Sequence, residues 1–118
     1  LEATISESLL QGIVHYPGTA EPGDEGNAFF TGHSSNVFWE LSKYNSIFAL
    51  LPNFEVGDDV FVYYEQTKYH YRVIAKKEVT PKDVSILEQG NQKHLTLMTC
   101  TPVGTNYRRL VVTAELID

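Results

Sequence analysis

Alternating apolar and polar residues predict strands in the second half of the chain. Residues 60–64 are apolar on both faces, which is typical of a strand in the middle of a sheet. Residues 69–76 alternate, with Tyr69, Tyr71, Val73 and Ala75 on one face. A short polar turn near residues 66–68 separates these two runs, so they predict a β-hairpin. Residues 94–100 and 109–117 predict two further strands.

Shorter elements are expected in the rest of the chain. Residues 3–10 predict a short helix ended by Gly12, residues 12–16 a first strand stopped by Pro17, residues 21–27 a surface loop and residues 28–31 a brief strand. We expect an irregular connection over residues 34–45 and one or two helical turns over residues 46–51. Thr80 as a capping residue followed by Pro81 predicts a helical turn over residues 80–83. The predicted class is all-β, with short strands suited to a closed barrel.

The alternation of the last two strands predicts their pairing. If they are antiparallel with Cys100 opposite Arg109, then Thr99 faces Leu110, Leu97 faces Val112 and Leu95 faces Ala114, which gives one almost wholly apolar face. A slip of one residue would set the apolar face of one strand against the face of the other strand that mixes polar and apolar residues, so the alternation disfavours such a slip. Cβ atoms directly across a ladder lie about 4.5–5.5 Å apart. The sequence therefore predicts that Cys100 lies beside the permanent positive charge of Arg109.

This pairing has chemical meaning because the thiolate is the nucleophilic form of cysteine, and a nearby cation favours it. The alternative is that Cys100 is a small buried hydrophobic residue, which is the common role of a lone cysteine in a strand, and that Arg109 is a solvated rim residue. The functional interpretation is favoured because both residues lie at the loop end of the same strand pair, on its less apolar face.

Composition narrows the classes of protein. A chain of 118 residues makes one domain, and its net charge of −6 provides no basic stripe for nucleic acid. One cysteine excludes an internal disulfide and an all-cysteine metal site. No apolar run approaches 18 residues and Leu1 follows no basic region, so we expect the chain as given neither to span a membrane nor to carry a signal peptide.

The four histidines have different settings. We expect His70 and His94 to be solvated surface residues and His15 to be structural, whereas His33 follows a strand and Gly32 at a boundary where functional residues concentrate. Taken alone, His33 would be a loop histidine without a role. No two histidines have the spacing of metal ligands, so no metal or cofactor is expected.

Three motifs in order resemble the sortase family of cysteine transpeptidases. Thr96-Leu97-Met98-Thr99-Cys100 is similar to the family's Thr-Leu-x-Thr-Cys signature, and Arg109 falls nine positions after the cysteine, as the family's arginine does. Residues 15–20 followed by Gly26-Asn27-Ala28-Phe29-Phe30-Thr31-Gly32-His33 resemble the stretch that leads to the family's catalytic histidine. The match extends from about Gly12 to Leu116, nearly the whole chain.

The resemblance implies one sortase catalytic domain over residues 1–118, a closed β-barrel with short helices, and a site made of His33, Cys100 and Arg109. Only about eight residues precede the matched segment, so the expectation allows for a barrel that lacks its first strand or strands. A calcium site, found in some members, would need clustered carboxylates such as Asp24, Glu25, Asp58 and Asp59, which we expect to be solvated instead.

The implied activity is transpeptidation. Cys100 would attack the threonine carbonyl of a Leu-Pro-x-Thr-Gly-type sorting signal near the C-terminus of a surface protein. Arg109 would hold the substrate backbone and the oxyanion, and His33 would act as general acid and then general base. Thr99 is a secondary candidate for oxyanion support, but its side chain faces away from Cys100 in the predicted register.

The implied partners and location follow from the same family. The partners are the surface protein and an amine acceptor, either a peptidoglycan precursor or a pilin lysine, at the extracytoplasmic face of a Gram-positive cell membrane. Two alternatives stay open: a cysteine protease that only hydrolyses, and a non-catalytic β-barrel binding domain with an inert thiol.

Overall fold

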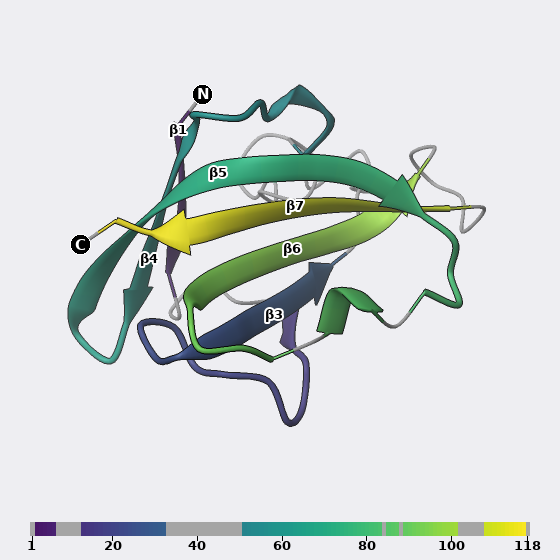
Figure 1. The fold of residues 1–118 in the computed structure, drawn as a ribbon. Coiled ribbons are helices and arrows are strands. Elements are labelled where there is room, and N and C mark those ends of the chain that lie inside the picture. The colour runs from purple at the N-terminus through teal and green to yellow at the C-terminus, as the bar shows by residue number, and fades with distance from the viewer. Residues whose placement is uncertain are drawn as a thin grey trace, which may run out of the picture.

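Seven strands form one sheet in the computed structural model, which describes residues 2–6, 13–32, 51–83, 85–87, 89–101 and 108–117. The elements are β1 (Glu2–Ser6), β2 (Ile13–His15), β3 (Gly26–Gly32), β4 (Asp59–Tyr64), β5 (Thr67–Val79), the 3-10 turn η4 (Ser85–Leu87), β6 (Lys93–Thr101) and β7 (Arg108–Leu116). Their order in the sheet is β1-β4-β5-β7-β6-β3-β2. Strands β5, β7, β6 and β3 lie side by side in Figure 1.

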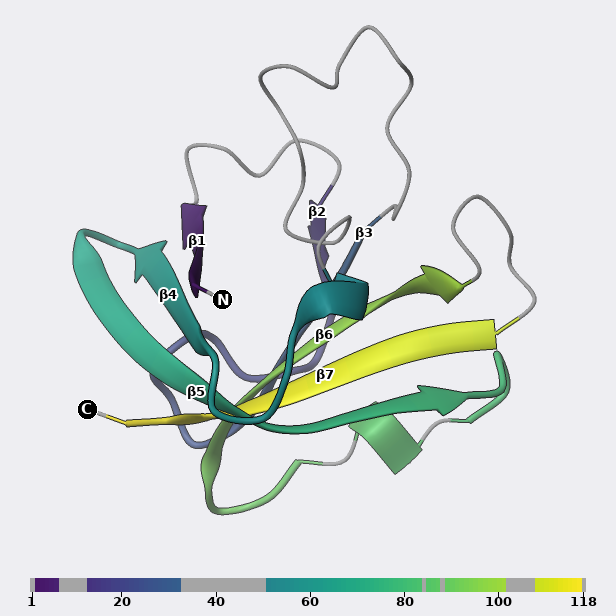
Figure 2. The same cartoon turned by 90° about the horizontal axis from the view of Figure 1, so that it is seen from above.

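The sheet curls around one hydrophobic core. Viewed from above in Figure 2, β1 and β2, the two edge strands of the described sheet, lie on the same side of the curl. The inner face, here called the core face, carries fully buried residues such as Val60, Tyr71, Leu97 and Val112, and a turn over residues 51–53 packs on it through Leu51. The prediction of an all-β fold is confirmed, and the described strands form one sheet that curls into a half-barrel.

The predicted register of β6 and β7 is confirmed at every pair. Leu95 pairs with Ala114, Leu97 with Val112, Thr99 with Leu110 and Cys100 with Arg109. The first three pairs are buried on the core face. The opposite face, here called the outer face, is also partly covered, because Phe29, Thr96 and Val111 are each 2% exposed or less.

The hairpin prediction is confirmed, with its turn slightly earlier than expected. Glu65 and Gln66 form the turn with φ angles of 48° and 66°, both in the left-handed region that suits a tight hairpin. Strand β4 lies between β1 and β5, in the interior of the sheet as predicted. Its outer face is nevertheless open, because Tyr63 is 40% exposed.

Two local predictions were wrong. Residues 2–6 form strand β1 instead of the start of a helix, because they pair in parallel with β4, from Glu2 opposite Asp59 to Ser6 opposite Tyr63. Pairing with a strand that is distant in the sequence overrides the weak helix preference of these few residues. Residues 7–10 lie outside the described part.

The helical turn predicted over residues 80–83 is a β-turn, closed by a hydrogen bond from the Asp83 N–H to the Thr80 carbonyl at 3.1 Å. The 3-10 turn starts at Ser85, whose N–H and hydroxyl both donate to Asp83 Oδ1 at 2.9 and 2.6 Å. The capping residue is therefore Asp83 and not Thr80. These two hydrogen bonds lower the pKa of the Asp83 carboxyl.

Two predicted segments fall wholly or largely outside the described residues: the irregular connection over 34–45 and the helical turn over 46–51, of which only residue 51 is described. None of the helices in the described part of the chain has the length and hydropathy for a membrane span.

Candidate active site

The structure brings Cys100 and Arg109 together in the backbone. They are directly paired across antiparallel β6 and β7, one position before the last pair of the ladder, Thr101 with Arg108. Arg109 is half-buried and lies on the outer face, since its neighbours Leu110 and Val112 alternate onto the core face. Strand β5 contributes Val79 on the other side of Arg109. Cys100 and Arg109 thus lie at one end of the three adjacent strands β5, β7 and β6.

Strand β3 arrives at this same end. It runs parallel to β6, with Phe29 opposite Thr96, Phe30 opposite Leu97 and Thr31 opposite Met98. Because parallel strands end at the same edge of a sheet, Gly32 at the end of β3 and Cys100 near the end of β6 leave the sheet on one side (Figure 1). His33, the residue after Gly32, lies outside the described residues.

A hydrogen bond fixes the two strands just before this end. The Thr31 hydroxyl donates to the Met98 carbonyl at 3.1 Å, which adds a side-chain tie to the parallel ladder. The side chains of Thr31 and Met98 are half-buried on the outer face, whereas Thr99 is 1% exposed on the core face. Thr99 lies on the core face, as the predicted register requires.

The neighbouring Arg108 has a different environment. Its Nε lies 3.3 Å from Glu78 Oε1 on β5, at ion-pair distance but without hydrogen-bond geometry. The two side chains are 39% and 53% exposed, so this pair contributes about 0–1 kcal/mol to stability. Alternation along β7 puts Arg108 and Arg109 on opposite faces of the sheet.

The other histidines do not join this site. His15 is structural as predicted: its Nε2 lies 2.7 Å from the Ala20 carbonyl, and its ring stacks on Phe30 at 4.8 Å. His70 is not simply solvated, because Nε2 lies 2.8 Å from Asp59 Oδ1 and the ring stacks on Phe61 at 4.6 Å. His94 is half-buried rather than solvated, and it pairs with Glu115 as predicted.

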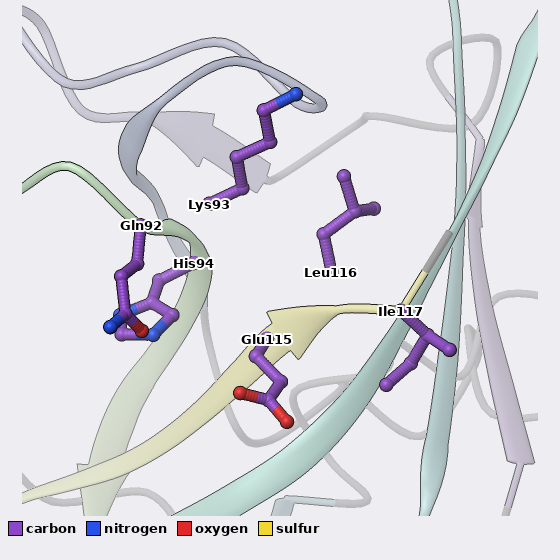
Figure 3. Close-up of a pocket in the computed structure, with 6 residues that line it drawn as sticks. All are labelled: Gln92, Lys93, His94, Glu115, Leu116 and Ile117. Carbon is purple, nitrogen blue, oxygen red and sulfur yellow. The ribbon is translucent and has the colours of Figure 1, made fainter.

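A cavity of about 290 Å³ lies at the opposite end of β6 from Cys100. Figure 3 shows the residues that line it: Gln92, Lys93, His94, Glu115, Leu116 and Ile117. His94 Nε2 is buried there and has no hydrogen-bond partner among the described residues. The Glu115 carboxylate and the Lys93 amine point in different directions in this view (Figure 3). The cavity contains none of the residues predicted to act on a substrate.

Within the ranges that the structure describes, no three His, Cys, Asp or Glu side chains gather as a metal ion would require. Two of the four carboxylates considered for calcium have other partners: Asp58 Oδ2 accepts the Glu55 N–H at 2.8 Å, and Asp59 lies against His70 and Arg72. The His70 hydrogen bond is the main reason why the pKa of Asp59 is lowered.

One group of polar residues on the outer face was not predicted. Asn27 and Thr96 are buried on the outer face, and the Thr96 hydroxyl donates to Asn27 Oδ1 at 2.6 Å. Both residues belong to motifs singled out in the sequence, but the pattern contained no sign that they meet. A buried asparagine in a strand is the only signal that could have pointed to such a bond.

Comparison with known proteins connects this geometry to a family. The Sortase domain family matches residues 1–117. The chain is 28% identical over 117 residues to Sortase A of Bacillus anthracis, and 32% identical over 94 residues to YwpE of Bacillus subtilis (strain 168). The alignment with Sortase A covers 99% of this chain and 52% of that protein. The alignment with YwpE covers 80% of this chain and 86% of that protein. The chain thus spans about half the length of the Bacillus anthracis protein.

Solved structures agree with the sequence comparison. Sortase C-1 from Actinomyces oris superposes with a TM-score of 0.78 at 29% identity, over 98% of this chain and 66% of that one. A sortase C from Clostridium perfringens, solved with the C-terminal cell wall sorting motif, gives a TM-score of 0.76 at 25% identity, over 93% and 58%. With the family match over nearly its full length and the same fold as solved sortases, the chain belongs to the sortase family.

Proposed function

We propose that residues 1–118 form a single sortase catalytic domain that acts as a cysteine transpeptidase. Its substrate is a surface protein with a Leu-Pro-x-Thr-Gly-type sorting signal near the C-terminus, and the acceptor is an amine of a peptidoglycan precursor or of a pilin lysine. The observation that carries this proposal is the direct pairing of Cys100 with Arg109 in a chain that belongs to the sortase family.

The position of His33 in the proposed site is supported by the parallel register. Thr31 pairs with Met98, and the same register extended by two residues would set position 33 beside position 100. Because β3 and β6 run in the same direction, their last residues lie at the same edge of the sheet. The constellation proposed is therefore Cys100 between His33 on one side and Arg109 on the other.

The proposed reaction has two steps. In the first, the Cys100 thiolate attacks the threonine carbonyl carbon and forms a C–S bond, while the Arg109 guanidinium donates hydrogen bonds to the oxyanion. The threonine–glycine C–N bond then breaks, and His33 gives its proton to the leaving amine.

In the second step the acceptor amine attacks the thioacyl carbonyl and loses a proton to His33. The C–S bond breaks and the Cys100 thiolate leaves, so that the product is a new amide and the enzyme returns to its starting protonation state. Arg109 suits its role because the planar guanidinium is always charged and donates in a fixed fork.

Relatives support the substrate class. The similar Clostridium perfringens sortase C was solved with the C-terminal cell wall sorting motif, which is the type of peptide proposed here. We accordingly place the domain at the extracytoplasmic face of the membrane, where such surface proteins emerge. No cofactor or metal is included in the proposal, because the two steps balance with the three side chains and the two substrates.

One assay tests the function. The protein is incubated with a quenched sorting-signal peptide and an amine acceptor, and the products are identified by mass. An amide product supports transpeptidation, the free acid alone would establish a hydrolytic protease, and a folded protein that cleaves nothing would establish a binding domain with an inert thiol. Cleavage that persists in Cys100→Ala would refute the assigned nucleophile.

A further inference from the structure

Two side-chain hydrogen bonds join β3 to β6 on the outer face, one near each end of their parallel ladder (Figure 1). Near the start, the Thr96 hydroxyl donates to Asn27 Oδ1 at 2.6 Å. At the end, the Thr31 hydroxyl donates to the Met98 carbonyl at 3.1 Å, and Thr31 with Met98 is also the last pair of this ladder. We name these two hydrogen bonds the outer ties.

The apolar pattern does not by itself fix the register of β3 on β6. On the core face, Ala28 pairs with Leu95 and Phe30 with Leu97. A slip of one residue would turn these side chains to the other face, but a slip of two keeps them inward because side chains alternate with a period of two. Phe30 would then lie opposite Leu95 or Thr99, which are also buried on the core face. Registers two residues apart are therefore nearly equivalent for the core.

The outer ties distinguish these registers, because a slip of two residues would break both of them. Asn27 is 7% exposed and Thr96 is 2% exposed, and a buried polar group that loses its partner costs more stability than the bond contributes when it is made. A buried polar pair whose members are satisfied in one arrangement only specifies that arrangement. The Asn27–Thr96 tie thus fixes the start of the ladder.

The Thr31 tie fixes the other end of the ladder, where the proposed site begins. Thr31 is the last residue of β3 with a side chain, because Gly32 follows and ends the strand. Positions 33 and 100 each lie two residues beyond the pair of Thr31 with Met98. A slip of two residues would move one strand by about 6.6 Å along the other. Misplacement of reacting groups by about 1 Å already costs roughly 10²-fold in rate.

We propose that Thr31 is a positioning residue, whose hydroxyl bond to the Met98 carbonyl fixes the end of β3 against β6 and thereby the distance between His33 and Cys100. The hydroxyl touches no reacting atom and acts through the register of the two strands. This inference rests on the proposed function, since it names the group that holds two proposed catalytic residues in place.

The test uses three substitutions of similar size. Thr31→Val removes the hydroxyl and keeps the β-branched shape, whereas Thr31→Ser keeps the hydroxyl. The matched control is Thr113→Val, because Thr113 is half-buried on the same face but belongs to β7, outside this ladder. We expect Thr31→Val to lower kcat by roughly 10–10²-fold without changing KM for the signal peptide. Thr31→Ser should recover most of the loss, and Thr113→Val should resemble the wild type.

A second readout needs no substrate. The pH dependence of alkylation by iodoacetamide reports the pKa of the single cysteine, which a nearby imidazolium lowers. We expect Thr31→Val to shift this profile to higher pH in the wild-type background and to have no further effect in His33→Ala, because Thr31 acts through His33. A merely structural role would lower the folded fraction, measured by circular dichroism, and would leave the profile of the folded protein unchanged.

The outcomes separate this inference from the proposed function. If the wild type forms the amide product and Thr31→Val keeps both its kcat and its alkylation profile, the positioning role is overturned and the function stands. A shift of the profile that persists in His33→Ala also overturns it. If the wild type cleaves no signal peptide, the proposed function fails, and the alkylation profiles still decide whether Thr31 acts on Cys100 through His33.

Discussion

Cys100 and Arg109 lie directly opposite each other on β6 and β7, while Arg108, the adjacent residue, lies opposite Thr101. Successive side chains of a strand point to opposite faces, so two arginines that are neighbours in sequence serve different surfaces. Arg108 reaches Glu78 at 3.3 Å, and Arg109 shares its face with Val79 of β5. The pair gives a matched test of which guanidinium acts on substrate.

We expect Arg109→Ala to lower kcat for transpeptidation by about 10²–10³-fold, as removal of an oxyanion donor does in other acyl transfers. Arg109→Lys should recover only part of this loss, because an ammonium keeps the charge but not the planar fork. Arg108→Ala should change kcat by less than roughly twofold, because it breaks only an exposed ion pair. Steady-state kinetics of all three variants decide this, and equal losses in Arg108→Ala and Arg109→Ala would contradict the assignment.

The same pairing predicts the reactivity of the thiol. Under the proposed function, the Arg109 guanidinium would stabilise the Cys100 thiolate, so we expect the pKa of Cys100 to be higher in Arg109→Ala than in the wild type. The pH dependence of alkylation by iodoacetamide measures this pKa, and the chain has one cysteine, so labelling is unambiguous. Arg108→Ala is the control and should keep the wild-type profile. An unchanged profile in Arg109→Ala would mean that the two side chains do not interact.

The register of β6 and β7 could be predicted because three consecutive inward positions on each strand are apolar, with the single exception of Thr99. Leu95, Leu97 and Thr99 meet Ala114, Val112 and Leu110, and a slip by one residue would have exposed this face. The Cys100–Arg109 pair follows from the same pattern because a short loop keeps the partners close in sequence. This part of the candidate site could therefore be predicted from residues that are close together in the sequence.

Strand β1 and the hydrogen bonds between Asn27 and Gln89 could not be predicted for the opposite reason. Residues 2–6 become a strand through pairing with β4, more than fifty positions later, and Gln89 reaches Asn27 across 62 residues. Neither short segment carries a periodic pattern long enough to identify its partner. The setting of His70 was missed likewise, because its contacts are with Asp59 and Phe61 on the neighbouring strand.

The Asp59 carboxylate provides a pH test. The pKa of Asp59 is lowered mainly because His70 hydrogen-bonds to the carboxylate, with a further contribution from Arg72. A lowered acid pKa stabilises the fold fully above the unfolded value, near pH 3.9, and this contribution is lost as the pH falls through the lower folded value. In His70→Ala the pKa of Asp59, followed by NMR of its carboxyl carbon, should rise toward the ordinary value. A pKa that does not move would show that His70 is not the cause.

Two glycines with nearly the same backbone separate conformational strain from packing. Gly18 has a φ of +85° and open space at its Cβ position, whereas Gly23 has a φ of +88° and a Cβ there would lie 2.2 Å from the Tyr69 ring. Gly23 also donates its N–H to the Tyr71 hydroxyl at 2.8 Å, which ties the loop before β3 to a fully buried side chain. Both positions disfavour alanine through the backbone, but only Gly23 adds a steric cost.

We therefore expect Gly18→Ala to lower the free energy of unfolding by about 1–2 kcal/mol, which is the cost of a left-handed backbone for alanine. Gly23→Ala should lose about a further 1–3 kcal/mol, because the Tyr69 ring has to move and the Tyr71 hydrogen bond is strained. Urea denaturation of both variants beside the wild type measures the difference. Equal destabilisation by the two substitutions would mean that the ring of Tyr69 yields freely and that the loop is not fastened at Gly23.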